Sequence, residues 1–133
     1  MLVSDLSKAL WNIGVTDFSV DFVGISSYQD ATTSSRKPTI TKEPTEIEGK
    51  HIIIVEDIID TGHSISFLKT YLQDKNCASV QVCTLLSKPS RREIPVTIDY
   101  VGFEIEDKWV EGYGMDTAGM GRGNPDIVER LEK

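Results

Sequence analysis

The sequence predicts a single α/β domain, residues 1–133, with a mostly parallel sheet flanked by helices. The first observation is a short β-branched run at residues 52–55, which is typical of a buried parallel strand. A helical pattern follows from residue 65, and a second apolar run covers residues 79–86. The order strand, helix, strand favours a right-handed crossover between parallel strands. A chain of 133 residues is large enough to build one hydrophobic core.

The residues before the first run predict a helix, a strand and a polar loop. Residues 4–11 place apolar side chains on one face of a helix, with Ser4 as the N-cap. Residues 16–25 alternate between apolar and polar side chains and end in an apolar stretch, which indicates a strand. Residues 26–36 are too polar to pack, so they form either a plain connector or a mobile flap. Residues 39–41 predict a short edge strand between two prolines.

The residues after the first run predict a further helix, two strands and a C-terminal helix. The helical face that starts at residue 65 continues to about residue 75, and Asn76 is a suitable stop. Residues 79–86 and 98–103 predict strands. Pro125 suits the first turn of a helix, so we expect a helix over residues 125–131.

Composition excludes some classes of function. Apolar and charged fractions of 39% and 26% are ordinary for a globular protein, and no run approaches the roughly 20 apolar residues of a membrane span. The N-terminus lacks the basic region and cleavage site of a signal peptide. Cys77 and Cys83 are therefore expected to be reduced, in a cytoplasmic protein. A net charge of −7 argues against nucleic-acid binding but permits an anionic substrate at a local site.

The stretch of residues 56–64, Glu-Asp-Ile-Ile-Asp-Thr-Gly-His-Ser, carries the strongest signal for a ligand site. It runs from a strand end into a helix start, where unpaired N–H groups suit a phosphate. Gly62 lets the backbone approach an anion, and Thr61 and Ser64 add hydroxyl donors. The carboxylates would repel a phosphate, so sugar hydroxyls or Mg²⁺ are their natural partners. The simpler alternative is an acidic surface turn.

The same stretch resembles the phosphoribosyl-pyrophosphate (PRPP) loop of type I phosphoribosyltransferases. Four apolar residues, Glu-Asp, two apolar residues and Asp-Thr-Gly occur in that order. The resemblance implies a type I phosphoribosyltransferase fold with a mobile flap loop, and it implies Mg²⁺ as cofactor. It implies that Asp60 is the general base. His63 stands at a position that varies in the family, and we give it no catalytic weight. The implied PRPP-binding residues are Glu56, Asp57, Asp60, Thr61, Gly62, His63 and Ser64, with Glu56 and Asp57 also at the metal.

A lysine follows the strand of residues 79–86. A lysine just past a strand end is usually solvated, but parallel strand ends converge on one crevice. The segment Thr-Leu-Leu-Ser-Lys88-Pro resembles that of purine phosphoribosyltransferases, where a lysine donates to O6 of the base. An ammonium group against a carbonyl selects 6-oxopurines over adenine.

A motif near the C-terminus resembles hypoxanthine-guanine phosphoribosyltransferases. It reads Asp-Lys-Trp109-Val110-Glu-Gly-Tyr-Gly-Met-Asp116. An aromatic residue beside a Gly-Tyr-Gly turn is more often part of a core. By resemblance, however, Trp109 stacks on the purine where the family usually has Phe or Tyr, and the backbone of Val110 reads the base edge. Asp116 lies near the base and helps hold Mg²⁺. Arg122, six residues later, matches an arginine that contacts pyrophosphate.

Two further features follow from the resemblance. Ser27 and Tyr28 correspond to a Ser-Tyr pair in the mobile flap that closes over the reacting centre. The family also carries an upstream apolar strand and a Leu-Lys-Gly loop that binds pyrophosphate, and neither precedes Met1 here. We therefore expect a domain that is N-terminally incomplete relative to the family. An exposed sheet edge then favours a homo-oligomer or association with the missing N-terminal segment.

The predicted function is Mg²⁺-dependent transfer of 5-phosphoribosyl from PRPP to hypoxanthine or guanine, in purine salvage. The partners are PRPP and a 6-oxopurine base, without nucleic acid or membrane. Two alternatives stay open: a PRPP-binding or nucleotide-binding regulatory or scaffold protein with impaired turnover, and a xanthine-preferring phosphoribosyltransferase.

Overall fold

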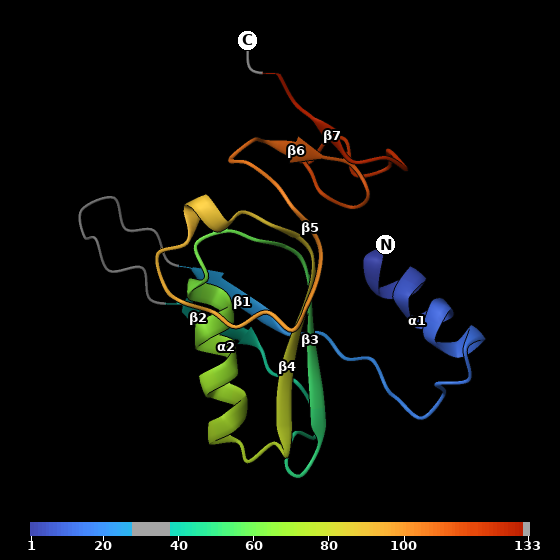
Figure 1. Cartoon of the computed structure of the whole chain (residues 1–133). Coiled ribbons are helices and arrows are strands. Elements are labelled where there is room, and N and C mark those ends of the chain that lie inside the picture. The colour runs from blue at the N-terminus through green and yellow to red at the C-terminus, as the bar shows by residue number, and fades with distance from the viewer. Residues whose placement is uncertain (28–37, 132–133) are drawn as a thin grey trace.

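The computed structural model describes residues 1–27 and 38–131 and shows a parallel sheet with one helix packed against it. The sheet has the order β3-β4-β5, and both of its pairings are parallel, as predicted. Its strands are β3 (His51–Ile59), β4 (Ser79–Ser87) and β5 (Tyr100–Glu104). Helix α2 (His63–Asp74) connects β3 to β4, and Figure 1 shows it alongside β4. Within the described part of the chain, no helix is long and apolar enough to cross a membrane.

The hydrophobic core lies between α2 and the sheet. Ile65, Leu68 and Leu72 recur at helical spacing on α2 and are at most 6% exposed. They pack against Ile54 and Val82, which are paired in register on β3 and β4. The predicted burial of the first run on both faces is wrong, since Ile53 is 53% exposed. Adjacent strand residues point to opposite faces, so the face away from α2 carries exposed apolar side chains.

Strand β3 is longer than predicted. It continues through Ile59, so Glu56 and Asp57 lie inside the strand and do not end it. The reason is the neighbouring strand, because the parallel ladder with β4 runs as far as the pair Ile59 and Ser87. Helix α2 likewise starts at His63, two residues before the expected start. Asn76 follows the helix with φ of 63°, in agreement with its role as a stop signal.

The N-terminal region differs from the prediction in two ways. Helix α1 (Leu2–Asn12) is present, but Met1 is its N-cap and Ser4 lies within its first turn. The strand predicted over residues 16–25 is mostly wrong, because only β1 (Gly24–Ser27) forms. It pairs with β2 (Pro38–Lys42), the predicted edge strand, in an antiparallel ribbon. Figure 1 shows α1 on the opposite side of the sheet from α2, with no buried residue on α1.

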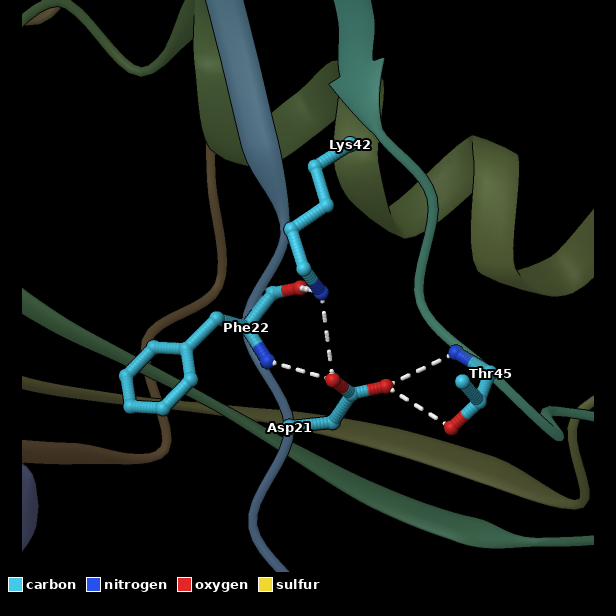
Figure 2. Close-up of polar contacts among 4 residues, drawn as sticks. All are labelled: Asp21, Phe22, Lys42 and Thr45. Atoms are coloured by element: carbon cyan, nitrogen blue, oxygen red, sulfur yellow. Dashed lines mark hydrogen bonds and ion pairs between the residues drawn. The ribbon is translucent and has the colours of Figure 1, made fainter.

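A carboxylate ties the start of the ribbon to the chain that follows it, as Figure 2 shows. Asp21 accepts hydrogen bonds from the backbone N–H of Thr45 at 2.7 Å and of Phe22 at 2.8 Å. It also accepts from the Thr45 hydroxyl at 2.9 Å and from Lys42 Nζ at 3.3 Å. These contacts, with the backbone of Thr45 first, hold the pKa of Asp21 well below its usual range. The sequence did not suggest this clamp.

The C-terminal residues form a separate small lobe beyond the end of β5 (Figure 1). Strands β6 (Val110–Glu111) and β7 (Val128–Glu129) pair antiparallel. The helix predicted over residues 125–131 is therefore wrong. Here the backbone of β6 offers β7 a pairing partner, which local sequence pattern does not reveal. A short 3₁₀ helix, η1 (Pro89–Arg91), follows β4.

Candidate functional site

The loop of residues 60–62 joins the end of β3 to the start of α2 at the carboxyl edge of the sheet. Gly62 is the N-cap of α2 and has φ of 92°, a left-handed conformation that favours glycine. A Cβ atom at Gly62 would lie 2.8 Å from the carbonyl oxygen of Ile94, so the space also requires glycine. No side chain of the described residues caps α2. The N–H groups of its first turn are therefore available to an anion.

The two carboxylates inside β3 have different surroundings. Burial, and then repulsion from Asp57, raise the pKa of Glu56 to about 7. The negative charge of Asp57 also affects the pKa of Tyr113. The pKa of Tyr113 is raised first by its hydrogen bond to Asp5, then by burial and by the charges of Asp5 and Asp57. The charge of Asp57 thus acts on both Glu56 and Tyr113.

A divalent cation would fit the carboxylates of β3, because it would offset the burial, and then the repulsion from Asp57, that raise the pKa of Glu56. Among residues 1–27 and 38–131, however, no three His, Cys, Asp or Glu side chains gather into a metal site. The predicted metal set of Glu56, Asp57 and Asp116 is thus not brought together. Mg²⁺ is commonly held by one or two carboxylates plus substrate phosphates. Glu56 and Asp57 are neighbours in β3, where successive side chains point to opposite faces, so one of them, together with substrate phosphates, would hold an ion of that kind.

Lys88 follows β4 directly and lies beside the loop. Its backbone N–H donates to the carbonyl of Ile59 at 3.0 Å, which joins the ends of two adjacent strands. The residue is only 6% exposed, although a lysine just past a strand end is usually solvated. Its Nζ lies 3.6 Å from Oδ1 of Asp107, which is half exposed. A buried ammonium with one partner at that distance retains donor capacity for a ligand oxygen.

The C-terminal lobe begins beside Lys88 and presents an aromatic face. The backbone N–H of Ile105 donates to the carbonyl of Ser87 at 2.8 Å, and this contact attaches the lobe to β4. Trp109 is 55% exposed, so the simpler alternative, that it belongs to a core, does not hold in this structure. Val110 is the first residue of β6. The carbonyl of its neighbour Trp109 accepts a hydrogen bond from the backbone N–H of Arg130 at 2.8 Å.

Asp116 and Arg122 bind each other within this lobe. Arg122 Nη2 lies 3.2 Å from Oδ2 of Asp116, and its Nη1 donates to the carbonyl of Gly114 at 2.8 Å. The same carboxylate oxygen accepts from the backbone N–H of Gly119 at 2.7 Å. The predicted metal ligand and the predicted pyrophosphate ligand are therefore adjacent, and each satisfies the other.

Comparison with known proteins decides the family. Residues 1–118 match the family described as phosphoribosyl transferase domain. The chain belongs to this family. It is 47% identical over 119 residues to the hypoxanthine phosphoribosyltransferase of Haemophilus influenzae, covering 89% of this chain and 64% of the relative. It is 42% identical over 113 residues to the hypoxanthine-guanine phosphoribosyltransferase of Bacillus subtilis, covering 84% and 63%. The chain thus spans slightly under two thirds of the length of these relatives.

Solved structures confirm the predicted fold. A hypoxanthine phosphoribosyl transferase of Trypanosoma cruzi superposes with a TM-score of 0.88 at 34% identity, covering 96% of this chain and 66% of that one. A hypoxanthine phosphoribosyltransferase of Staphylococcus aureus gives a TM-score of 0.80 at 34% identity, covering 92% and 70%. The type I phosphoribosyltransferase fold, predicted from the PRPP-like loop, is therefore correct.

The phosphoribosyltransferase domain places the predicted residues in two groups. The loop and Lys88 share one edge of the sheet, while Trp109, Val110, Asp116 and Arg122 lie in the lobe. Ser27 ends β1, and Tyr28 lies outside the described residues.

Sequence reasoning missed the residues that surround the loop. His63, which was given no catalytic weight, has Nε2 3.3 Å from Oε1 of Glu93. Arg91 and Arg92 also contact the loop, through Asp60. The signal for them was two adjacent arginines just after Lys88.

Proposed function

We propose that the chain is a hypoxanthine-guanine phosphoribosyltransferase of purine salvage. It transfers the 5-phosphoribosyl group of PRPP to N9 of hypoxanthine or guanine and yields IMP or GMP plus pyrophosphate. One observation carries the proposal: the uncapped start of α2 and the buried Lys88 lie at the ends of adjacent strands. An anion site and a buried donor are thus combined at one edge of the sheet. The names of the relatives in Haemophilus influenzae and Bacillus subtilis add support.

The loop binds the phosphoribosyl group in this proposal. Backbone N–H groups at the start of α2, with the hydroxyls of Thr61 and Ser64, bind the 5′-phosphate. Glu56 and Asp57 bind the ribose hydroxyls, directly or through Mg²⁺. When bound, Mg²⁺ neutralises charge on the leaving pyrophosphate. Burial of Glu56 lowers the local dielectric constant and so strengthens its interaction with a cation.

The base lies against Lys88 and the C-terminal lobe. Lys88 donates to O6 of the purine, and the 6-amino group of adenine offers it no acceptor. Trp109 stacks on the ring and the backbone of Val110 reads its edge. In the reaction the bond from N9 to C1′ forms and the bond from C1′ to pyrophosphate breaks. The displaced ring proton passes to the carboxylate of Asp60, which acts as the general base.

Arg122 binds the leaving pyrophosphate in this proposal, and Asp116 lies near the base. Their 3.2 Å ion pair then has to be exchanged for contacts to substrate. The guanidinium of an arginine suits a bidentate contact to pyrophosphate oxygens. Arg122 therefore exchanges one anionic partner for another.

We also infer that the chain self-associates or binds an N-terminal segment, in the cytoplasm. The support is the exposed apolar side chains of the sheet, since Ile53 and Tyr100 on one face and Phe103 of β5 on the other are each more than half exposed. For the Trypanosoma cruzi relative, the C-terminal region has a role in oligomeric state and enzymatic activity. The two cysteines are free thiols, which agrees with a reducing compartment. Light scattering on the purified chain measures the association.

The direct test is pyrophosphate release by the purified chain with PRPP, Mg²⁺ and each of hypoxanthine, guanine, xanthine and adenine. We expect turnover with hypoxanthine and guanine and none with adenine. Turnover restricted to xanthine would reassign the substrate. Binding of PRPP or GMP without turnover for any base would favour a regulatory or scaffold protein.

A further inference from the structure

The segment of residues 91–94, which we name the strap, is hydrogen-bonded to the loop of residues 60–62. The backbone N–H groups of Glu93 and Ile94 both donate to the carbonyl of Thr61, at 3.0 and 3.2 Å. Nη1 of Arg92 donates to the carbonyl of Asp60 at 2.7 Å. Two consecutive loop carbonyls are therefore fixed by three donors from one short segment.

Arg92 connects the loop to the neighbouring strand as well. Its Nη2 donates to the hydroxyl of Ser87 at 2.6 Å. Ser87 is the last residue of β4 and is only 2% exposed, so this end of the fork is firmly placed. The planar guanidinium thus sets the position of the Asp60 carbonyl relative to β4. A lysine at position 92 would have a single charged nitrogen and could not span both acceptors with the same geometry.

Arg91 contacts the side chain of the same loop residue. Its Nε donates to Oδ1 of Asp60 at 3.0 Å. Its pKa is raised first by this hydrogen bond and then by the charges of Asp60, Asp107 and Glu93. The carboxylate of Asp60 has a second oxygen, Oδ2, for a substrate proton. Arg91 thus orients the carboxylate that the proposed mechanism uses as a base.

The close fit at Gly62 shows how little room the loop has to move towards the strap. A Cβ atom there would lie 2.8 Å from both the carbonyl oxygen of Ile94 and a methyl carbon of Val96. Atoms of the strap and of Val96 therefore fill the space beside Gly62, the N-cap of α2. Without the strap, the loop would have to be ordered at the moment of phosphate binding, at a cost in conformational entropy.

We propose that Arg92 and Arg91 are positioning residues for phosphoribosyl transfer. Arg92 preorganises the backbone of the loop for the 5′-phosphate, and Arg91 orients the carboxylate of Asp60 for the ring proton. The inference rests on the proposed function for its kinetic consequences, but the contact between strap and loop is independent of it. Arg92 then affects the KM for PRPP, whereas Arg91 affects kcat.

The variants Arg92→Lys and Arg91→Gln test the two roles, with Arg130→Lys, directly after β7, as the matched control. We expect Arg92→Lys to raise the KM for PRPP about ten-fold and to leave the KM for hypoxanthine within about two-fold. We expect Arg91→Gln to lower kcat about ten-fold with little change in the KM for PRPP. Equal losses in every kinetic parameter would indicate a merely structural role and overturn the proposal.

Amide hydrogen exchange at Glu93 and Ile94 provides a readout that needs no activity. Both N–H groups donate to Thr61, so Arg92→Lys should accelerate their exchange about ten-fold or more, while Arg130→Lys should not. Unchanged exchange in a folded Arg92→Lys variant would overturn the inference, whatever the wild type does with PRPP. A different outcome separates the two proposals. If exchange is faster in Arg92→Lys but the wild type turns over no base, the contact between strap and loop is supported and the proposed function is refuted.

The variant Ser87→Ala tests the same contact independently, in case Arg92→Lys has a folding defect. It removes one acceptor of the guanidinium fork and leaves the contact to Asp60. We expect Ser87→Ala to accelerate the same exchange to a smaller degree, and the double variant to add little beyond Arg92→Lys. Additive effects of the two substitutions would show that they act separately. That result would contradict the proposal that the guanidinium of Arg92 links Asp60 to Ser87.

Discussion

The indole N–H of Trp109 donates to the hydroxyl of Thr117 at 2.6 Å, across a separation of eight residues. Thr117 stands at the start of a tight turn closed by paired hydrogen bonds with Met120. The ring of Trp109 is otherwise half exposed, so this bond fixes the plane of the surface on which a base would stack. A phenylalanine at position 109 would have no N–H for such a bond.

The variant Thr117→Val should therefore weaken base binding without affecting PRPP. Valine keeps the shape of threonine and removes the acceptor, which is worth about 0.5–1.5 kcal/mol. We expect the KM for hypoxanthine to rise about three- to ten-fold and the KM for PRPP to stay unchanged.

Fluorescence checks the same prediction independently of kinetics. Trp11 and Trp109 are the two tryptophans, so a Trp11→Phe background isolates the signal of Trp109. The emission anisotropy should fall in Thr117→Val because the indole gains freedom. An unchanged anisotropy together with an unchanged KM would contradict the role of Thr117.

Removing the charge of Lys88 should separate activity from stability. Lys88→Met should lower kcat/KM for hypoxanthine about ten- to a hundred-fold, the value of a charged hydrogen bond. Its melting temperature should stay equal or rise, because a buried ammonium is replaced by an apolar group of similar length, and Asp107 remains solvated. Kinetics and thermal unfolding of the same preparation measure both.

Lys108→Met is the control for this variant, since Lys108 is exposed and pairs with Glu106 and Glu129 on the surface. It should leave kcat/KM within about two-fold, in line with the small value of exposed ion pairs. Full activity in Lys88→Met would remove Lys88 from base recognition.

Replacing Asp60 with asparagine tests the general base. Asp60→Asn should lower kcat about a hundred-fold or more with folding intact. Asparagine keeps an oxygen for the N–H of Arg91, so the loop should retain its geometry. Single-turnover kinetics and circular dichroism separate the two effects. Wild-type turnover in Asp60→Asn would show that another group accepts the ring proton.

The sequence was sufficient for features that depend on local periodicity. The alternation of strand, helix and strand around residues 51–87 was predicted because apolar spacing on α2 and the β-branched run are properties of short segments. The strand predicted for residues 16–25 failed before Gly24 because alternation alone provides no pairing partner, and in the structure Phe18, Val20 and Phe22 are exposed. The helix predicted in the tail failed for the opposite reason, because Val128 found a partner in Glu111.

The candidate site also contains some features that the sequence predicts and others that it does not. The loop and Lys88 were found because their chemistry follows strand ends, and strand ends were predictable. The ion pair of Lys88 was not predictable, because its partner Asp107 lies 19 residues later and belongs to the lobe. The contacts of Arg92 depend on Asp60 and Ser87, which lie on two different elements. Such contacts require the tertiary fold.

The raised pKa of Glu56 predicts a stability that falls with increasing pH. Its pKa moves from 4.5 to about 7 in the folded chain, chiefly through burial and further through Asp57. Between these pH values the folded chain binds more protons than the unfolded chain, so the free energy of unfolding decreases as pH rises from about 4.5 to about 7. The shift corresponds to at most about 3 kcal/mol.

Urea unfolding between about pH 5 and pH 8 measures this slope. Glu56→Gln should be flatter over the same range, whereas Glu48→Gln, an exposed glutamate in the turn before β3, should follow the wild type. Added Mg²⁺ should flatten the wild-type profile, because a cation favours the ionised carboxylate, and should have little effect on Glu56→Gln. Identical slopes in wild type and Glu56→Gln would show that Glu56 is ionised throughout, and then Mg²⁺ would have no repulsion to relieve at this position.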